Sequence, residues 1–428
     1  MRGLMAKFKG LLGLLTGNVL AQAIYIAAIP IIARIYTPDQ IGELTLLISI
    51  LAIINVFATL KLELALPIES NNSRLINLLV ACLLILTAIT LLTFIGVHLV
   101  WSYKIYAESI WIYLLPVMLF GEGLYNLAIY YSIRLQNYKG IAVSKFSKSL
   151  LTNGSQITFG TLNSGSLSLV AGDIFGRLLG ANRLLKNIFD LLKENRKSIS
   201  KKRVLESVKF HRKFPLLSSV SAFFNSSALQ MFPIFLGMMY SNYYLGLFAM
   251  GQRILISPMT LISQAVGQFF LGNATELVRE GNIHKLKLTF YRYAISLFGI
   301  SLVIVLLVVL FSEKLIFLFL GSQWHETKEV IKLISFMVVI QFSVSPLSQI
   351  LNILKKQELQ FIWDLTRFIF VVGTLICIKQ FNLEFHQSIL IYSILVTSTY
   401  LLLLALITAV LNRVDHSKSD RIVHKKSM

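Results

Sequence analysis

Seven of the ionisable side chains that lie inside long apolar stretches of the sequence could do chemistry there, because charge is rare in such stretches. A charge near the centre of a bilayer costs about 3 kcal/mol on insertion scales, so each should face protein or water. Carboxylates in such places bind coupling ions or buried bases, and guanidinium groups bind phosphate through paired N–H donors. The residues to assign to this chemistry are Glu43, Glu122, Asp173, Arg177, Arg253, Asp364 and Arg367.

Four of these charges form pairs at helical spacing. Asp173 and Arg177 are four residues apart, and Asp364 and Arg367 are three apart. Both spacings put the partners on one helix face. Two interpretations follow: the pairs neutralise themselves, or the arginines also line a cavity.

Arg253 has no acidic residue within one turn of its own apolar stretch. It therefore requires either an anionic ligand or an acid on another helix, with Glu122 and Glu43 as the candidates. Arginine suits phosphate because its planar fork donates two parallel hydrogen bonds. We interpret Arg253 as a candidate phosphate contact.

Glu122 lies between two glycines in "LFGEGLYN" and is open to two interpretations, a coupling-ion site for H⁺ or Na⁺ or a structural ion pair. Arg34 closes the first apolar stretch, where a long side chain reaches the membrane surface. Four amides could hydrogen-bond the hydroxyl groups of a ligand or join helices: Asn18, Gln22, Asn126 and Gln252.

No motif indicates a metal or redox site. Cys82 and Cys377 lie far apart in apolar stretches, and the sequence has no CxxC, HxxH or HExxH spacing. We therefore expect no metal and no bound cofactor.

The elements that position these residues are predicted to be membrane-spanning helices. The 428 residues are 56% hydrophobic and 14% charged, with a mean hydropathy of +0.72. Apolar stretches of spanning length recur without the alternation of barrel strands. The expected all-α integral membrane protein has about twelve spans, at 11–34, 40–60, 75–100, 111–133, 149–164, 166–182, 214–239, 243–270, 293–311, 330–352, 362–380 and 388–411.

Basic residues predict the orientation. With the N-terminus inside, 31 of the 40 Lys and Arg residues fall in inner segments and 5 in outer ones. This bias predicts cytoplasmic N- and C-termini. It also explains the net charge of +20 without nucleic acid as a partner.

One long basic segment, 183–213, separates the two sets of six spans. Leu184, Leu185 and Ile188 recur in it at helical spacing, which predicts an amphipathic helix on anionic membrane lipids. Docking of a partner protein is the alternative. The expected domains are an N-terminal six-helix lobe (1–182), this linker (183–213), a C-terminal six-helix lobe (214–411) and a cytoplasmic tail (412–428).

One short sequence, called the corner here because it is predicted to turn the chain from one span into the next, occurs twice. Tyr36, Thr37 and Gly42 in "RIYTPDQIGEL" match Tyr240, Ser241 and Gly246, each 204 residues later. Each corner follows the first span of its six, so the halves are predicted to repeat in parallel. Such repeats place the substrate path between them.

The stretches "NVLAQAIYIAAIPIIARIYTPDQIGELTLLISI" and "LKLELALPI" resemble the polysaccharide-export branch of the MOP flippase superfamily, with the Wzx-type O-antigen and capsule flippases as the nearest match. "YYLGLFAMGQRILISPMTLISQAVGQFF" resembles the corresponding stretch of the second half. Glu43 departs from the family pattern, which usually has an apolar or aromatic residue there.

The resemblance implies two MATE-like lobes that flip undecaprenyl-diphosphate-linked oligosaccharides across a bacterial inner membrane by alternating access. Other polysaccharide-assembly membrane proteins are expected partners. The implied cationic cavity would use Arg34, Arg177, Arg253 and Arg367, with Glu43, Glu122, Asp173 and Asp364 as coupling or pairing acids. Coupling to an H⁺ or Na⁺ gradient is expected as the energy source.

Two rivals share the superfamily, a multidrug-type exporter and a lipid II-type flippase. A membrane enzyme is disfavoured because the longest outer segment, 312–329, is short and lacks paired catalytic acids.

Overall fold

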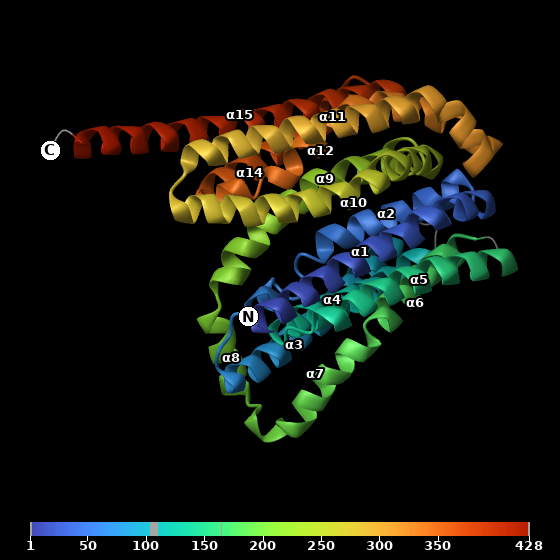
Figure 1. Ribbon diagram of the computed structural model, residues 1–428. Coiled ribbons are helices and arrows are strands. Elements are labelled where there is room, and N and C mark those ends of the chain that lie inside the picture. Colours follow the sequence, from blue (N-terminus) through green and yellow to red (C-terminus); the bar gives the residue numbers. More distant parts are fainter. Residues whose placement is uncertain (1, 103–109, 164, 427–428) are drawn as a thin grey trace. The chain divides into compact units, whose positions relative to one another are not determined.

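The computed structural model describes residues 2–102, 110–163 and 165–426 (Figure 1). Every regular element in these ranges is a helix, which confirms the all-α prediction. Each predicted span falls on a helix: α1 (Arg2–Ile35), α2 (Pro38–Ile54), α3 (Asn72–Ser102), α4 (Leu115–Arg134), α5 (Tyr138–Leu162), α6 (Ser166–Gly180), α9 (Ser219–Met239), α10 (Asn242–Glu280), α11 (Ile283–Leu315), α12 (Thr327–Val344), α14 (Gln357–Gln380) and α15 (Phe385–Lys426).

Among the described residues, nine helices are long and apolar enough to cross a membrane. The other three predicted spans fall short for visible reasons. Helices α2 and α6 have 17 and 15 residues, and α5 carries three lysines among its 25 residues. The chain is a multi-pass membrane protein, and the count of twelve spans stays a prediction.

The contacts divide the chain into two compact units, Met1–Gly246 and Leu247–Met428. The boundary falls inside α10 and not in the predicted linker 183–213, because α9 packs on α2 within the first unit. The expected tail 412–428 continues α15 as far as Lys426, and its last two residues lie outside the described ranges.

In the first unit, α5 packs between α1 and α6. Three glycines spaced four apart on α6 allow its close approach to α5. A Cβ atom on Gly172, Gly176 or Gly180 would lie 2.6, 1.7 or 2.7 Å from an α5 side chain. In lipid, helices associate through close van der Waals packing and not through the hydrophobic effect, and small residues permit that packing. The glycine-rich sequence of the fifth and sixth spans thus serves helix packing.

The first corner is fixed by its own side chains. Thr37 accepts a hydrogen bond from the Gln40 N–H at 3.4 Å, and the Gln40 side chain accepts one from the Thr37 N–H at 3.0 Å. This reciprocal capping satisfies two N–H groups at the start of α2. The buried Tyr36 hydroxyl donates to the Gln156 carbonyl at 2.6 Å and ties the corner to α5.

The second corner repeats two of the hydrogen bonds of the first. The Ser241 hydroxyl accepts a hydrogen bond from the Tyr244 N–H at 3.5 Å. This bond matches the one from the Gln40 N–H to Thr37 in the first corner. The Tyr240 N–H donates to the Leu236 carbonyl at 3.1 Å, and the Tyr36 N–H donates to the Ile32 carbonyl at 3.0 Å. The sequence match between the corners is therefore a match in geometry.

The two corners also touch each other through their glycines. A Cβ atom on Gly42 would lie 1.8 Å from the Asn242 carbonyl oxygen, and one on Gly246 would lie 1.9 Å from that of Pro38. Pro38 and Asn242 are themselves matched at the 204-residue separation. The first turns of α2 and α10 thus make one contact twice, as a local two-fold relation requires.

A second turn repeats at a separation of 219 residues. Gln136, between α4 and α5, has φ 54°, and Lys355, just before α14, has φ 56°. The next residue donates its N–H to a carbonyl five residues back in both places, Asn137 to Ser132 at 2.9 Å and Lys356 to Leu351 at 2.7 Å. The two halves therefore share an inner turn as well as an outer corner.

The second unit is built on α12, which packs against α11 and α15, while α14 also packs on α15. Helix α15 extends along this unit toward the C-terminus (Figure 1). Trp363 of α14 donates to the Thr399 carbonyl of α15 at 2.9 Å, which fixes the register of these two helices.

The linker differs from its prediction. It forms two helices, α7 (Asn182–Glu194) and α8 (Lys201–Phe210). Leu184, Leu185 and Ile188 are buried in the protein, where α7 packs on α4 and α5. The apolar face expected on the membrane surface is thus covered by protein, because the ends of α4 and α5 offer it an apolar surface.

Helix α8 docks on the start of α3 through a buried charge. His211 Nε2 lies 2.8 Å from Glu69 Oε2, and Arg74 Nη1 lies 3.4 Å from the same oxygen. Asn77 donates to the Ser198 carbonyl at 3.1 Å and accepts from the Ser200 N–H at 3.3 Å. The linker is held to the first unit at both ends of α8.

Gly42→Ala is expected to lower the unfolding free energy by about 1–3 kcal/mol, because the added methyl group overlaps the Asn242 backbone. The measurement is thermal unfolding of the purified protein followed by size-exclusion fluorescence. Gly154→Ala is the matched control, because a Cβ atom there has nothing within 4 Å. Equal melting temperatures for the two variants would contradict the backbone contact.

The charge that holds α8 should respond to acid. Burial raises the pKa of the Glu69 carboxyl, but the Asn71 N–H, His211 and Arg74 outweigh burial and hold this pKa below its ordinary value of 4.5. A carboxyl whose pKa is lower in the folded than in the unfolded protein stabilises the fold. This contribution is complete above the unfolded-state pKa of about 4.5 and is lost as the pH falls through the folded-state pKa.

We therefore expect the α8 amides to exchange hydrogen faster below pH 4.5 than at pH 7, after correction for the intrinsic exchange rate. In Glu69→Gln, exchange should already be fast at pH 7 and change little on acidification. An unaltered pH dependence in Glu69→Gln would exclude this carboxyl as the cause.

Candidate functional site

Four charged side chains meet inside the first unit and are called the N-half cluster: Glu122 of α4, Lys148 of α5, and Asp173 and Arg177 of α6. Lys148 Nζ lies 2.8 Å from Glu122 Oε2, and Arg177 Nη1 lies 2.5 Å from the same oxygen. Arg177 also forms a two-point ion pair with Asp173. Three helices are thus joined by one balanced set of two acids and two bases.

The N-half cluster is only slightly accessible. The four side chains are between 10% and 24% exposed. The Lys148 ammonium group also lies 4.0 Å from the centre of the Tyr125 ring, where the face of the ring attracts a cation. Taking these charges out of water is tolerable because each has an opposite partner at hydrogen-bond distance.

The spacing argument placed Asp173 and Arg177 together, and the structure contains that pair. Spacing within one helix does not find Lys148, which falls between the predicted spans 111–133 and 149–164. In the structure α5 begins at Tyr138, capped by Asn137, which accepts from the Gly140 N–H at 2.9 Å. An asparagine before the apolar residues Ile141 and Ala142 was the available signal for this earlier start.

The C-half cluster lies in the second unit on α14 and α15. Arg367 Nη2 lies 3.5 Å from Asp364 Oδ1, and Arg367 Nη1 donates to the Tyr400 hydroxyl at 3.3 Å. The Arg367 guanidinium lies 4.5 Å from the centre of the Trp363 ring. Asp364 and Arg367 are 4% and 3% exposed, so this predicted pair is the more deeply buried of the two.

The two clusters are related by the repeat. Lys148 and Arg367 are 219 residues apart, the separation of the repeated inner turn, so each half places a cation at the same position of its fifth helix. The partner acids differ. In the first half, the acid that binds Lys148 is Glu122 of α4. The matching position on α12 in the second half is the neutral Gln341. The acid that binds Arg367 is instead Asp364, on the same helix as Arg367.

The remaining candidates lie elsewhere in the described structure. Arg34 is exposed in the last turn of α1, and Arg253 is half-buried in α10. Glu43, half-buried in α2, lies within hydrogen-bonding reach of Ser166 and Trp111. The four amides are all partly exposed: Asn18, Gln22, Asn126 and Gln252.

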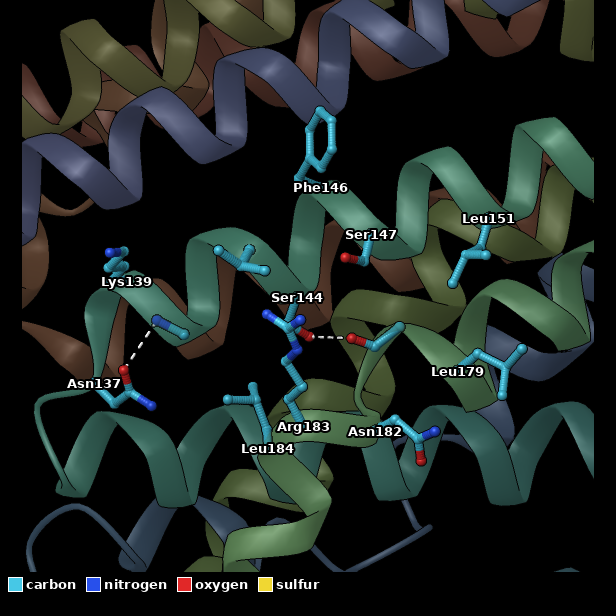
Figure 2. Close-up of a pocket in the computed structure, with 13 residues that line it drawn as sticks. Asn137, Lys139, Ser144, Phe146, Ser147, Leu151, Leu179, Asn182, Arg183 and Leu184 are labelled. Carbon is cyan, nitrogen blue, oxygen red and sulfur yellow. Dashed lines mark hydrogen bonds between the residues drawn. The ribbon is translucent and has the colours of Figure 1, made fainter.

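Two cavities offer space for ligands. One of about 850 Å³ lies at the start of α5 in the first unit and is drawn in Figure 2. The other, of about 170 Å³, lies between α10 and α12 in the second unit and presents Thr260, Ser263, Gln341 and Ser345. Within the described ranges, no three His, Cys, Asp or Glu residues gather as a metal site would require.

The fold is that of MOP-superfamily transporters. A structure described as an inward-facing MATE-family multidrug resistance transporter matches with a TM-score of 0.68 at 15% identity, covering 92% of this chain and 96% of that chain. The lipid II flippase MurJ, inward closed, matches at 0.68 and 15%, covering 92% and 86%. The eukaryotic MATE transporter AtDTX14 matches at 0.62 and 12%, covering 98% and 100%.

The family of the chain is identified from its sequence. The profile described as "Polysaccharide biosynthesis protein" matches residues 31–329, which is most of the chain. The chain therefore belongs to this family, and the resemblance read from its first and second halves is confirmed at the level of family and fold. No curated protein sequence matches it significantly.

Glu122→Gln should destabilise the first unit by about 3 kcal/mol, because Lys148 and Arg177 then share a single acid in a poorly solvated place. Adding Lys148→Gln restores the charge balance, so the double variant should melt at a higher temperature than Glu122→Gln alone. Lys193→Gln, the same charge change on α7, is the control and should give no recovery. Additive effects of Glu122→Gln and Lys148→Gln would show that the two side chains are not coupled.

Proposed function

We propose that the protein flips a lipid-linked oligosaccharide across the cytoplasmic membrane by alternating access. The substrate would be an undecaprenyl-diphosphate-linked repeat unit of the O-antigen or capsule type. The observation that carries this proposal is the joint one: a family of polysaccharide biosynthesis on a fold whose solved examples are transporters. The role is transport and not catalysis.

The fold alone leaves the cargo open, because its solved examples include a multidrug transporter and a lipid II flippase at the same TM-score. The family match distinguishes among them, since its description concerns polysaccharide. A polysaccharide flippase is therefore preferred to a multidrug-type or lipid II-type exporter of the same superfamily.

Arg177 and Arg367 are the weaker candidates for binding the substrate. Arg177 and Arg367 each bind an acid in their own unit, so their charge is largely neutralised before any ligand arrives. Arg253 is half-buried on α10, where the matching position in the first half is the buried, neutral Ser49. We assign Arg253 to the diphosphate group, with Arg34 as a further cation at the membrane surface.

Energy coupling to H⁺ or Na⁺ is part of the proposal. Glu122 is poorly suited to bind such an ion, because Lys148 and Arg177 already occupy one of its oxygens. Glu43 is better placed, since Ser166 and Trp111, which are neutral, lie within hydrogen-bonding reach of its carboxylate.

Deletion of the gene should abolish surface polysaccharide, and the wild-type chain should restore it. Arg253→Ala should reduce export at least about tenfold at equal protein level, because a charged partner of the diphosphate is lost. Arg279→Ala is the matched control, an exposed arginine on the same helix. The readout is polysaccharide on the cell surface and lipid-linked oligosaccharide in the inner leaflet.

Unchanged surface polysaccharide after deletion would overturn the function. Normal export by Arg253→Ala would leave the function standing and remove Arg253 from the substrate site.

A further inference from the structure

The cavity of about 850 Å³ combines a charged end with an apolar wall. It lies between the start of α5, the end of α6 and the first turn of α7 (Figure 2). Its polar lining comes from Asn137, Lys139, Ser144, Ser147, Asn182 and Arg183, and its apolar lining from Val143, Phe146, Leu151, Leu179 and Leu184.

One face of α5 supplies both charged and apolar groups to the cavity. Lys139, Val143, Ser147 and Leu151 follow one another at four-residue intervals, so they share one face of α5. The face begins with an ammonium group in the first turn and ends with a leucine more than three turns further along. A ligand that follows this face must be charged at one end and apolar at the other.

The charged end has two cations. Lys139 and Arg183 are exposed, and neither makes an ion pair within 4.0 Å among the residues with described side chains. Figure 2 shows the Arg183 side chain reaching from α7 toward Ser144 on α5. The Ser144 hydroxyl donates to the Gly180 carbonyl at 2.6 Å, which joins α5 to the end of α6 at this point.

Part of the apolar wall is exposed at the surface of the protein, although Leu184 in it is buried. Val143 and Leu179, which line the cavity, are 37% and 40% exposed, and the neighbouring Leu150 and Phe175 are 50% and 47% exposed. In a membrane protein such a surface contacts acyl chains. The two cations lie beside the start of the basic linker, and basic segments of this kind attract anionic lipid head groups.

We propose that this cavity binds one anionic phospholipid of the surrounding membrane. Its phosphate is held by Lys139 and Arg183. One acyl chain follows Val143, Leu151 and Leu179. Free phosphate shares the head-group chemistry, but it would leave the apolar wall uncovered, and a zwitterionic lipid would bring its own cation to the two basic side chains.

The test uses the full-length protein in detergent, with bound lipids counted by native mass spectrometry. Dioleoyl phosphatidylglycerol is the probe, and dioleoyl phosphatidylcholine is the neutral comparison with the same chains. Lys139→Ala with Arg183→Ala should weaken phosphatidylglycerol binding about thirtyfold, since each cation contributes about 1 kcal/mol at a membrane surface. Lys186→Ala with Lys193→Ala is the control, with equal charge loss on α7 outside the cavity.

A second variant tests the apolar part without changing charge. Ser147→Leu fills the cavity near its middle and should weaken phosphatidylglycerol binding while leaving the control phosphatidylcholine count unchanged. Inorganic phosphate at equal concentration should not displace the lipid.

Three results would overturn the proposal. The first is equal binding of the two dioleoyl lipids, and the second is wild-type phosphatidylglycerol binding by the Lys139→Ala, Arg183→Ala variant. The third is a preference for inorganic phosphate or for undecaprenyl phosphate over phosphatidylglycerol. Size-exclusion profiles identical to wild type confirm that each variant is folded.

Discussion

The need to neutralise charge inside apolar helices organises this protein. An ionised side chain in a membrane segment is stable only beside an opposite charge or water. The N-half cluster meets this condition by drawing α4, α5 and α6 to a single point, and the C-half cluster meets it within α14 and against α15. The glycines of α6 are part of the same solution, because they let α6, which carries Asp173 and Arg177, pack closely against the helix of Lys148.

The two halves match more closely in backbone geometry than in their charges. The corners share the hydrogen bond from a backbone N–H to the hydroxyl of Thr37 or Ser241, the turns at Gln136 and Lys355 share theirs, and a cation lies at the same position of each fifth helix. The acids have not kept their positions. Where the first half uses Glu122 on a neighbouring helix, the second has Gln341 there and supplies Asp364 from the same turn as its arginine. Backbone geometry thus repeats more faithfully than the means of neutralising charge.

What the sequence could predict was local or periodic. Helix positions follow from apolar length, and the Asp173–Arg177 and Asp364–Arg367 pairs follow from spacing within one helix. The contact of Lys148 with Glu122 joins residues 26 apart on two helices, and no spacing rule contains it. The same holds for Glu69 and His211, which are 142 residues apart.

The linker shows a different limit of sequence reasoning. Its apolar spacing correctly predicts a helix with one buried face, but spacing does not say what covers that face. Leu184, Leu185 and Ile188 would look the same in the sequence against lipid or against protein. Only the position of α4 and α5 decides between them.

The glycine contact between α2 and α10 has a consequence for how those helices can part. Because Gly42 rests on Asn242 while Gly246 rests on Pro38, the two contacts lie across a shared local axis. Each glycine rests on the backbone of the other helix, so a movement of the two helix starts directly apart would release both contacts together.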